Sequence, residues 1–234
     1  MEKLSIIIPI YNEQATLAEC VRRVLAVQLP LELELVLVDD ASADDSAKII
    51  HELCKQHDQV QIKVVTHQLN QGKGAALRTG FANVSGDIAI IQDADLEYDP
   101  ADYHRLLKPI LDGRADVVYG SRFVGSAEKR VIYYWHYVGN KLLTTFSNMC
   151  TNLNLTDMET CYKVFRREVI DRLNIKCDRF GVEPEMTAKI AKAGWKIYEV
   201  GISYSGRTYA EGKKITWKDG VKAILTIIRF RFFN

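Results

Sequence analysis

Short apolar runs alternate with longer amphipathic segments over the first half of the chain. The apolar runs predict strands at residues 4–10, 33–38, 62–66, 87–92 and 116–119. Helical spacing between them predicts helices over residues 14–26, 74–82 and 101–111. A further helix is predicted after the second strand and ends at residue 57. Because the strands are apolar on both faces and alternate with helices, the pattern predicts a doubly wound α/β fold with a mostly parallel sheet.

The pattern changes beyond residue 121. Residues 124–155 leave the simple alternation, and the last segment, 217–233, again follows helical spacing with Lys and Arg interleaved. Basic amphipathic helices lie in bilayer interfaces. A helix over residues 221–233 is only about 20 Å long at 1.5 Å per residue, which is too short to span the hydrocarbon core of a bilayer. We therefore divide the chain into a domain, 1–211, and a C-terminal helix, 212–234, which docks on a membrane or packs on the domain.

Composition and charge narrow the class of protein. A chain of 234 residues with 47% hydrophobic residues can form one large core, and its 31 basic and 30 acidic residues provide no field for nucleic acid. Five scattered cysteines without a C-x-x-C pair argue against a disulfide framework or zinc site and fit a reducing cytosol. We find no signal-peptide pattern and no run of about 18 apolar residues. We therefore expect a cytoplasmic protein that does not cross a membrane.

Asp93 and Asp95 follow an apolar strand and are candidates for a divalent cation site. In open α/β sheets ligands bind beyond the carboxyl ends of strands, and a cation held there by carboxylates keeps positions for substrate phosphates. The pair therefore suggests a metal-bound diphosphate, although a turn or helix cap is the alternative. Gly72-Lys73-Gly74 fits neither a P-loop nor a dinucleotide fingerprint.

The loops after the first two strands carry side chains suited to a nucleoside. The ring of Tyr11 can stack on a base, and the carboxylates of Glu13 and Asp40 can accept hydrogen bonds from a base or ribose. Each has a simpler interpretation, since Pro9 can end a strand and Asp40 can cap a helix. Their joint order favours a nucleoside diphosphate site.

Taken together, six segments resemble glycosyltransferase family 2 enzymes of the GT-A fold, most closely the polyprenyl-phosphate branch similar to dolichol-phosphate mannose synthase. They are residues 9–13, 38–42, 70–75, 93–97, 120–123 and 155–157, and the resemblance covers nearly the whole chain. It implies a GT-A fold with a C-terminal helical extension on the acceptor side. It also implies inverting, metal-dependent transfer of a sugar from a nucleotide sugar.

The resemblance also implies roles for individual residues. It places the nucleoside at Pro9, Tyr11, Glu13, Val38 and Asp40, and the rest of the nucleotide sugar at Lys73, Asp93, Ala94 and Asp95. The metal site falls on Asp93, Asp95 and Glu97. Relatives of the mannose synthase type often have glutamine at the position of Glu97, so the preferred metal stays open between Mg²⁺ and Mn²⁺.

Cleavage of a sugar–diphosphate bond builds negative charge that cations must stabilise. Arg122, Arg207 and Lys213, or its neighbour Lys214, are the candidates for contact with donor and acceptor phosphates. Arginine is favoured because its planar fork binds phosphate bidentately. The alternatives are a surface ion pair for Arg122 and a solvated loop for the lysines.

The acceptor decides whether a general base is needed. A phosphate monoester has a second pKa of about 6 and is already ionised, whereas a hydroxyl must lose its proton. Asp157 is the first candidate base for a hydroxyl and Glu159 the second. By resemblance, Arg130 and Asn140 lie on the acceptor side, where the aromatic run 131–137 contacts a lipid tail or instead belongs to the core or a dimer contact. The roles of Glu183 and Glu185, facing the acceptor or holding Arg207, stay open.

These observations predict an enzyme with Asp95, Arg122 and Asp157 as catalytic residues. It transfers a hexosyl group from GDP-mannose or a UDP-hexose to polyprenyl phosphate, peripherally bound to the cytoplasmic face of the membrane. One alternative keeps the donor and uses a hydroxyl acceptor on a glycan or lipid. Another is a non-catalytic nucleotide-sugar binding protein. A homo-oligomer stays open.

Overall fold

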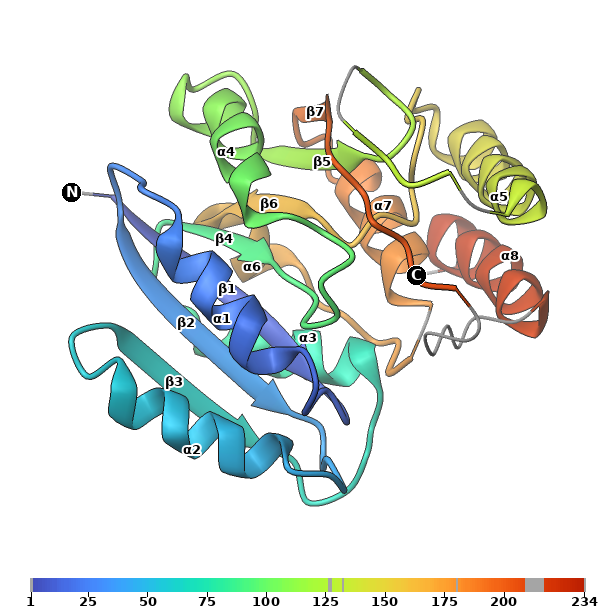
Figure 1. Cartoon of the computed structure of the whole chain (residues 1–234). Helices are drawn as coiled ribbons and strands as arrows, with labels where there is room; N and C mark the ends of the chain where they lie inside the picture. Colours follow the sequence, from blue (N-terminus) through green and yellow to red (C-terminus); the bar gives the residue numbers. More distant parts are fainter. Residues whose placement is uncertain (1, 126–127, 132, 180, 209–216, 234) are drawn as a thin grey trace.

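Seven strands of the described residues form one sheet in the computed structural model (Figure 1). The structure describes residues 2–125, 128–131, 133–179, 181–208 and 217–233. The strands are β1 (Lys3–Ile10), β2 (Glu32–Asp39), β3 (Gln61–Thr66), β4 (Ile88–Ile91), β5 (Val117–Ser121), β6 (Lys163–Arg166) and β7 (Ile197–Gly201). Their order in the sheet is β3-β2-β1-β4-β6-β5-β7.

Helices cover both faces of this sheet (Figure 1). They are α1 (Leu17–Ala26), α2 (Ser46–Gln56), α3 (Lys73–Asn83), the short 3₁₀ helix η1 (Pro100–Asp102), α4 (Tyr103–Leu111), α5 (Tyr134–Thr151), α6 (Arg167–Arg172), α7 (Val182–Lys192) and α8 (Trp217–Phe232). The predicted doubly wound, mostly parallel α/β fold is confirmed.

The central strands are apolar because both of their faces are covered. In β1 the side chains of Ile6, Ile7 and Ile8 are all completely buried. Ile7 lies opposite Val36 of β2 and Ile91 of β4 in parallel register. A strand buried on both faces needs a continuous apolar run rather than alternation, which is the pattern that predicted it.

The strand β6 was not predicted from the sequence, and it changes the topology. It lies between β4 and β5 and runs antiparallel to both, with Phe165 opposite Ala89 and Val117. Four residues are too few to show a clear period. Because β6 runs in the opposite direction, its first residue lies at the edge where the parallel strands end. The loop that precedes β6 is therefore delivered to that edge.

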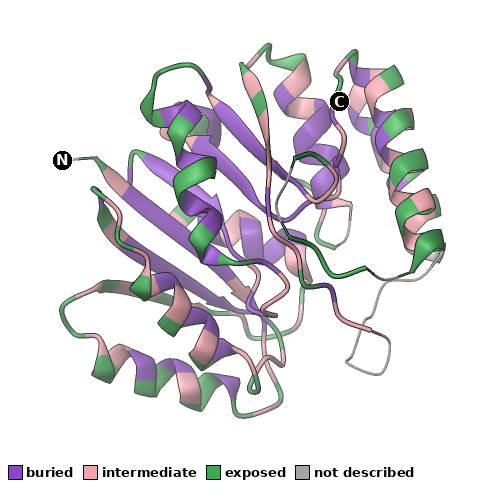
Figure 2. Cartoon of the chain, turned by 45° about the horizontal axis from the view of Figure 1, so that its top comes forward, coloured by how far each residue is buried: buried purple, intermediate pink, exposed green. Residues whose placement is uncertain are grey.

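The C-terminal helix packs on the domain with one face and exposes the other. Ala223, Ile227 and Phe230 are buried, and α8 lies against α5 and α7 (Figure 1). Figure 2 shows the strands of the sheet largely in the colour of buried residues and the helices with exposed residues on their outer sides. Val221 and Leu225 are exposed. Packing on the domain is thus observed for one face, while membrane docking stays a prediction for the other. Among the described residues, no helix is both long enough and apolar enough to cross a bilayer.

Candidate active site

The predicted site residues gather along one edge of the sheet. This edge is formed by the carboxyl ends of β1, β2 and β4 and by the start of β6. Three basic side chains meet carboxylates there, in the pairs Lys73–Asp93, Arg207–Asp95 and Arg122–Asp157. The site is built from these pairs.

The loops after β1 and β2 are tied to each other by polar side chains. Ser42 Oγ accepts from Asn12 N at 3.0 Å, and Asn12 Oδ1 accepts from Ala43 N at 2.8 Å. Behind these loops, Pro9 lies opposite Val38 in the β1–β2 register, and Val38 is buried. Residues 9–13 and 38–42, which the nucleoside prediction uses, therefore form one connected surface.

The two side chains predicted to meet the nucleoside from the loop after β1 differ in exposure. Tyr11 is exposed. Glu13 is half-buried; its Oε2 accepts from Thr16 Oγ1 at 3.0 Å and lies 4.0 Å from an Arg207 nitrogen. The stacking of Tyr11 on a base stays a prediction, and Glu13 contacts Thr16 and Arg207.

Asp40 holds the loop that leads into α3. Its buried carboxylate accepts from Gln71 N at 2.9 Å, from Gly72 N at 2.7 Å and from the Asn70 side chain at 2.8 Å. The ring of His67 lies 2.7 Å from the same carboxylate. Sequence reasoning assigned Asp40 to a base or ribose. The structure shows a second role, since this carboxylate fixes the backbone of residues 70–72.

Lys73 begins α3 and points back to β4. Its Nζ lies 2.8 Å from Asp93 Oδ2 and 3.3 Å from Glu183 Oε1, which comes from the first turn of α7. The preceding residue, Gly72, has a φ of +102°, a left-handed conformation that favours glycine. The glycines around Lys73 thus allow the turn that brings its side chain to Asp93.

Arg207 occupies the other side of the D-x-D segment. Its guanidinium lies 2.9 Å from Asp95 Oδ2 and 3.4 Å from Glu97 Oε1, and its backbone N–H donates to Glu97 Oε1 at 2.7 Å. Tyr204 Oη donates to Glu97 Oε2 at 2.8 Å. Burial and the nearby charges of Asp93 and Glu97 raise the pKa of Asp95 to about 7. The carboxylates here are crowded, and Arg207 offsets part of their charge.

The donor set of this segment fits a hard divalent cation. Carboxylate oxygens such as those of Asp93 and Asp95 are common ligands of Mg²⁺ and Mn²⁺. A bound cation would also reduce the electrostatic repulsion of Asp95 by Asp93 and Glu97. Within the described parts of the chain, no three His, Cys, Asp or Glu side chains are grouped as a metal site. All three predicted ligands have basic or hydroxyl partners in this structure: Asp93 pairs with Lys73, Asp95 with Arg207, and Glu97 with Arg207 and Tyr204. The assignment of Asp93, Asp95 and Glu97 to a metal stays a prediction.

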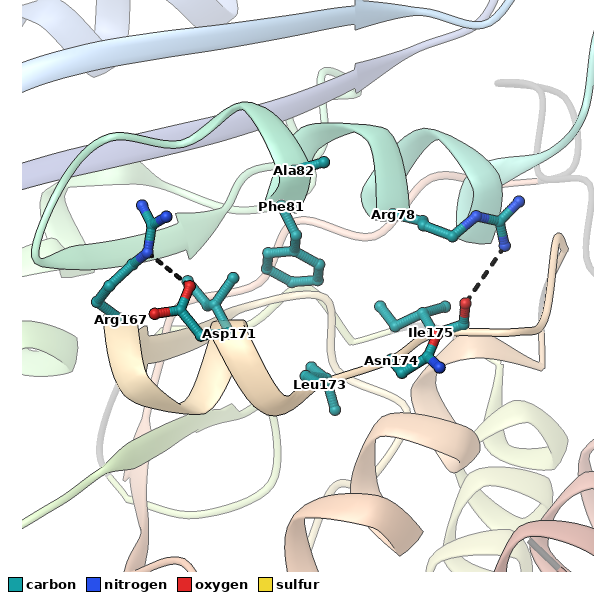
Figure 3. Close-up of a pocket in the computed structure, with 9 residues that line it drawn as sticks. Arg78, Phe81, Ala82, Arg167, Asp171, Leu173, Asn174 and Ile175 are labelled. Atoms are coloured by element: carbon teal, nitrogen blue, oxygen red, sulfur yellow. Dashed lines mark hydrogen bonds and ion pairs between the residues drawn. The ribbon is translucent and has the colours of Figure 1, made fainter.

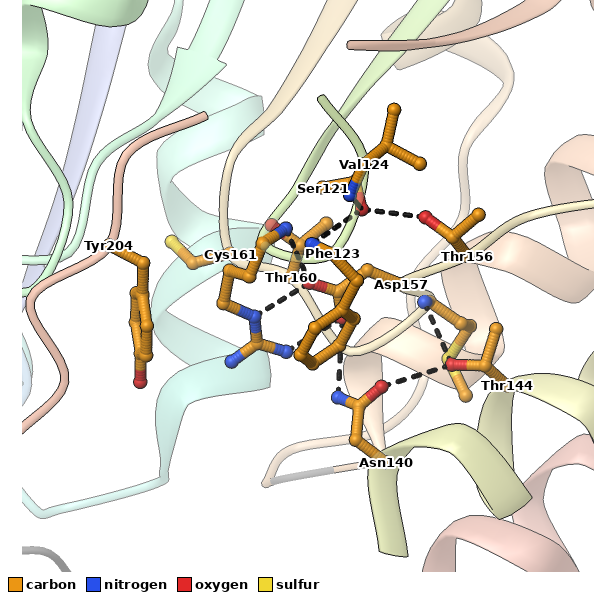
Figure 4. Close-up of polar contacts among 12 residues, drawn as sticks. Ser121, Phe123, Val124, Asn140, Thr144, Thr156, Asp157, Thr160, Cys161 and Tyr204 are labelled. Atoms are coloured by element: carbon orange, nitrogen blue, oxygen red, sulfur yellow. Dashed lines mark hydrogen bonds and ion pairs between the residues drawn. The ribbon is translucent and has the colours of Figure 1, made fainter. Parts of the chain in front are cut away.

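Arg122 and Asp157 form a bidentate pair beyond β5. Figure 4 shows Asp157 with its neighbour Asn140. Arg122 donates through Nε to Asp157 Oδ2 at 2.6 Å and through Nη2 to Oδ1 at 2.7 Å, and its backbone N–H donates to Oδ2 at 3.1 Å. Asn140 of α5 donates to Asp157 Oδ1 at 3.2 Å. The guanidinium also lies over the ring of Tyr204, 5.1 Å from its centroid. The Arg122 fork is thereby fixed in one orientation.

The loop before β6 is fixed by Glu199 of β7. Glu199 Oε1 accepts from Thr156 N at 2.8 Å and from Asp157 N at 3.1 Å. Asp157 is 0% exposed. In this structure the oxygens of the candidate base therefore accept hydrogen bonds from Arg122 and Asn140.

A second acid lies next to this pair. Glu159 is half-buried, and its buried Oε1 has no hydrogen-bond partner among the described residues. Burial and the charge of Glu183 raise its pKa to about 8. Lys163, which sequence reasoning missed, is buried nearby and donates to the Met158 and Thr160 carbonyls. A lysine inside a β-strand gives no sequence signal of such a position.

The remaining candidates fall into three groups. Arg130 donates to the Gly206 carbonyl at 3.2 Å and so contacts the segment that carries Arg207. Lys213, with Lys214, lies outside the described residues. Glu183 contacts Lys73, and Glu185 binds the backbone of residues 176 and 177. Arg207 pairs with Glu13, Asp95 and Glu97, so the alternative in which Glu183 or Glu185 holds it is not observed.

A hollow of about 270 Å³ lies away from this edge, between α3 and α6 (Figure 3). Its arginines are already paired, Arg78 with Asp178 and Arg167 with Asp171, both at 2.8 Å. Phe81 and Ile175 are among its apolar lining. It contains none of the predicted site residues, and nothing in its chemistry joins it to the site.

Comparison with known proteins gives the family. The model described as "Glycosyl transferase family 2" matches residues 5–173. Two similar curated proteins, from Proteus mirabilis and Photorhabdus laumondii, are both named undecaprenyl-phosphate 4-deoxy-4-formamido-L-arabinose transferase. They are 29% and 30% identical over 216 residues. Each match covers 91% of this chain but 63% of the relative's length.

Solved structures show the same fold. Glucosyl-3-phosphoglycerate synthase from Mycobacterium tuberculosis, in complex with Mn²⁺, UDP and glucosyl-3-phosphoglycerate, superposes with a TM-score of 0.73 at 19% identity. That match covers 98% of this chain and 80% of the synthase. The complex with Mn²⁺, UDP and phosphoglyceric acid gives 0.74 at 18% identity, covering 100% of this chain and 80% of the synthase. The likeness confirms the GT-A fold.

Proposed function

Because this chain belongs to glycosyltransferase family 2, we propose that it transfers a hexosyl group from GDP-mannose or a UDP-hexose to polyprenyl phosphate with inversion. The observation that carries the proposal is the pairing of Lys73 with Asp93 and of Arg207 with Asp95 at the sheet edge, next to Arg122. Relatives named for transfer to undecaprenyl phosphate support the acceptor class.

On the donor side, the residues of this chain bind and orient the diphosphate. A divalent cation held by Asp93 and Asp95 supplies electrophilic stabilisation of the leaving diphosphate when bound. Structural neighbours crystallised with Mn²⁺ and UDP are consistent with a divalent cofactor, either Mg²⁺ or Mn²⁺. When the donor binds, Lys73 moves from Asp93, and Arg207 from Asp95, to oxygens of the donor diphosphate. Tyr11 stacks on the base.

On the acceptor side, the geometry favours a phosphate. Both Asp157 oxygens accept from Arg122, and Oδ1 also accepts from Asn140, so this carboxylate is engaged as an anchor of the cation rather than placed to take a proton. A phosphate acceptor is already ionised and needs no base. Arg122 and Arg130 supply the positive charge that guides the phosphate to the anomeric carbon. The hydroxyl-acceptor alternative requires Asp157 to leave this pair and act as the base.

A peripheral position on the cytoplasmic face of the membrane follows for a lipid acceptor. Val221, Leu225 and Phe232 recur on the outer face of α8 at helical spacing and are exposed. Trp135 and Leu142 of α5 are exposed on the helix packed next to it. All five cysteines are free thiols, which suits a reducing compartment. Such a surface fits an anionic bilayer, and a second copy of the chain is the competing occupant.

The test is a transfer reaction with purified protein. Undecaprenyl or dolichyl phosphate is incubated with Mg²⁺ or Mn²⁺ and, separately, GDP-mannose, UDP-glucose, UDP-galactose or UDP-N-acetylglucosamine. Mass spectrometry of the organic extract is expected to show a glycosyl phospholipid with one donor. Release of nucleoside diphosphate without a lipid product would favour the hydroxyl acceptor. Binding of a donor without release of nucleoside diphosphate would favour the non-catalytic binding protein.

A further inference from the structure

Glu185 lies in the first turn of α7, two positions after the glutamate that touches Lys73. We propose that Glu185 is a positioning residue for Lys73 and acts through the backbone of residues 176–178, here called the strap. The proposal rests on the donor site described above, in which Lys73 serves the diphosphate. It gives a function to a buried charge that the transfer reaction itself does not use.

The first step is the contact between Glu185 and the strap. Glu185 is completely buried, and its two oxygens accept from two consecutive backbone N–H groups, Lys176 N at 2.7 Å and Cys177 N at 2.6 Å. Lys189, one turn further along α7, lies 2.5 Å from Glu185 Oε1. A buried carboxylate that accepts charge-assisted bonds from two adjacent N–H groups fixes both the position and the direction of that backbone.

The second step is the contact between the strap and the loop that carries Lys73. Ala75 N donates to the Asp178 carbonyl at 3.1 Å. A Cβ atom added at Gly74 would lie 2.1 Å from the Cys177 carbonyl oxygen, and one added at Gly72 would lie 2.5 Å from that of Asp178. The backbone of the glycines on both sides of Lys73 is therefore in direct contact with the backbone of the strap. A displacement of the strap would displace this loop as well.

The third step fixes the loop from its other side. Asp40 binds Gln71 N and Gly72 N, so residues 70–75 are held between a carboxylate at the end of β2 and a strap held by a carboxylate of α7. Lys73 projects from the centre of this clamp to Asp93 and Glu183. Because the Lys73 ammonium must meet its partners at hydrogen-bond distance, a displacement of the strap moves it out of reach of the diphosphate. Misplacement by about 1 Å can lower reaction rates by roughly 10²-fold.

The experiment is a double-mutant cycle on nucleotide affinity. Binding of UDP and of GDP, each with Mn²⁺, is measured by calorimetry for the intact chain, and the tighter nucleotide is used throughout. Glu185→Gln keeps the shape but places an amide NH₂ against one of the two N–H groups, and we expect affinity to fall by about tenfold, as for other outer-shell partners. Lys73→Met is expected to weaken binding at least as much. In Lys73→Met, adding Glu185→Gln should cost nothing further, since both changes remove one effect.

A matched control separates the strap from the ion pair. Lys189→Met removes the salt bridge to Glu185 but leaves both strap N–H groups bound, so it should keep nucleotide affinity within about twofold. Thermal unfolding of each variant is followed by circular dichroism, because a merely structural role would lower the melting temperature without giving a cycle that depends on Lys73. If Glu185→Gln fails to fold, Gly74→Ala replaces it, since the added methyl group displaces the strap from the other side.

Each outcome of the cycle decides something definite. Additive losses in the double variant, or unchanged affinity in Glu185→Gln and Gly74→Ala, overturn the positioning role. Unchanged affinity in Lys73→Met overturns instead the donor site on which the proposal rests. A loss in Glu185→Gln that vanishes in the Lys73→Met background supports it.

Discussion

The two halves of the sheet edge hold their carboxylates in different ways. On the donor side, the side chains of Asp93 and Asp95 are 19% and 14% exposed and follow a parallel strand. On the acceptor side, Asp157 is completely buried and precedes an antiparallel strand. The first pair is accessible to a ligand, whereas the second is enclosed and acts by holding Arg122. Carboxylates at one edge therefore differ in access, and we propose that Asp93 and Asp95 bind the donor directly while Asp157 orients Arg122.

The largest expected effect is a loss of turnover when the predicted metal site on the donor side is changed. Asp95→Asn keeps the shape but removes a charge needed by the cation, and we predict that turnover falls by at least about 10²-fold. Release of nucleoside diphosphate measures it. Asp112→Asn, at an exposed carboxylate paired with Arg114, is the control and should retain turnover. Full activity of Asp95→Asn with Mg²⁺ and Mn²⁺ would contradict the metal assignment.

The next effect concerns the acceptor half and is one of stability. Asp157→Asn removes the fully buried counter-charge of the Arg122 guanidinium, and we expect the free energy of unfolding to fall by about 3–5 kcal/mol. Urea denaturation measures this change. Asp93→Asn, at a partly exposed carboxylate, should cost clearly less. Equal losses at the two positions would mean that the two halves do not differ as described.

The outer surface of the acceptor half should also behave differently from other exposed apolar positions. Leu225 of α8 is 62% exposed, and Leu69, between β3 and α3, is 76% exposed. Inserting a leucine side chain into an interface contributes about 1.5–3 kcal/mol, so Leu225→Glu should weaken co-sedimentation with anionic liposomes about tenfold or more. Leu69→Glu should leave it unchanged. Wild-type protein that stays in the supernatant and elutes as a dimer would favour a second copy as the occupant.

The last prediction concerns the pH dependence of stability. The pKa of Glu159 is raised from 4.5 to about 8, first by burial and then by Glu183, so the folded state binds a proton that the unfolded state releases between these values. Stability should therefore fall as pH rises from about 5 to 8. Glu159→Gln cannot lose that proton, so its melting temperature should fall less steeply over the same range. Asp95 and Glu199 also have raised pKa values and will leave some slope. Parallel slopes for the two proteins would show that Glu159 does not titrate in this range.

The local pattern of apolar residues was sufficient to predict the parallel strands of the first half of the chain. Buried parallel strands require continuous apolar runs, so their positions and the carboxylates that follow them can be read from neighbouring residues. The predicted strand before Asp93, for example, ends close to the observed end of β4 at Ile91. The placement of Asp93 and Asp95 at the sheet edge needed no distant contact.

The rest depends on contacts between distant residues. The four residues of β6 have no visible period, and nothing local shows that this strand enters between β4 and β5. The occupation of Asp40 by residues 70–72 and of Glu185 by the strap likewise arises only when separate segments meet. Sequence reasoning proposed Arg207 as a cation of the site, but it could not identify Asp95 and Glu97 as the partners that the structure shows.

The contact between Arg207 and Asp95 spans 112 positions of the chain. The strands β1 to β4 all lie within the first 91 residues and can pair as soon as these have left the ribosome. Arg207 is made more than a hundred residues later. We therefore expect that during synthesis the half predicted to bind the nucleotide folds before Arg207 is available to complete the site. A ribosome-arrested chain that ends before Arg207 is expected to be compact yet unable to transfer sugar.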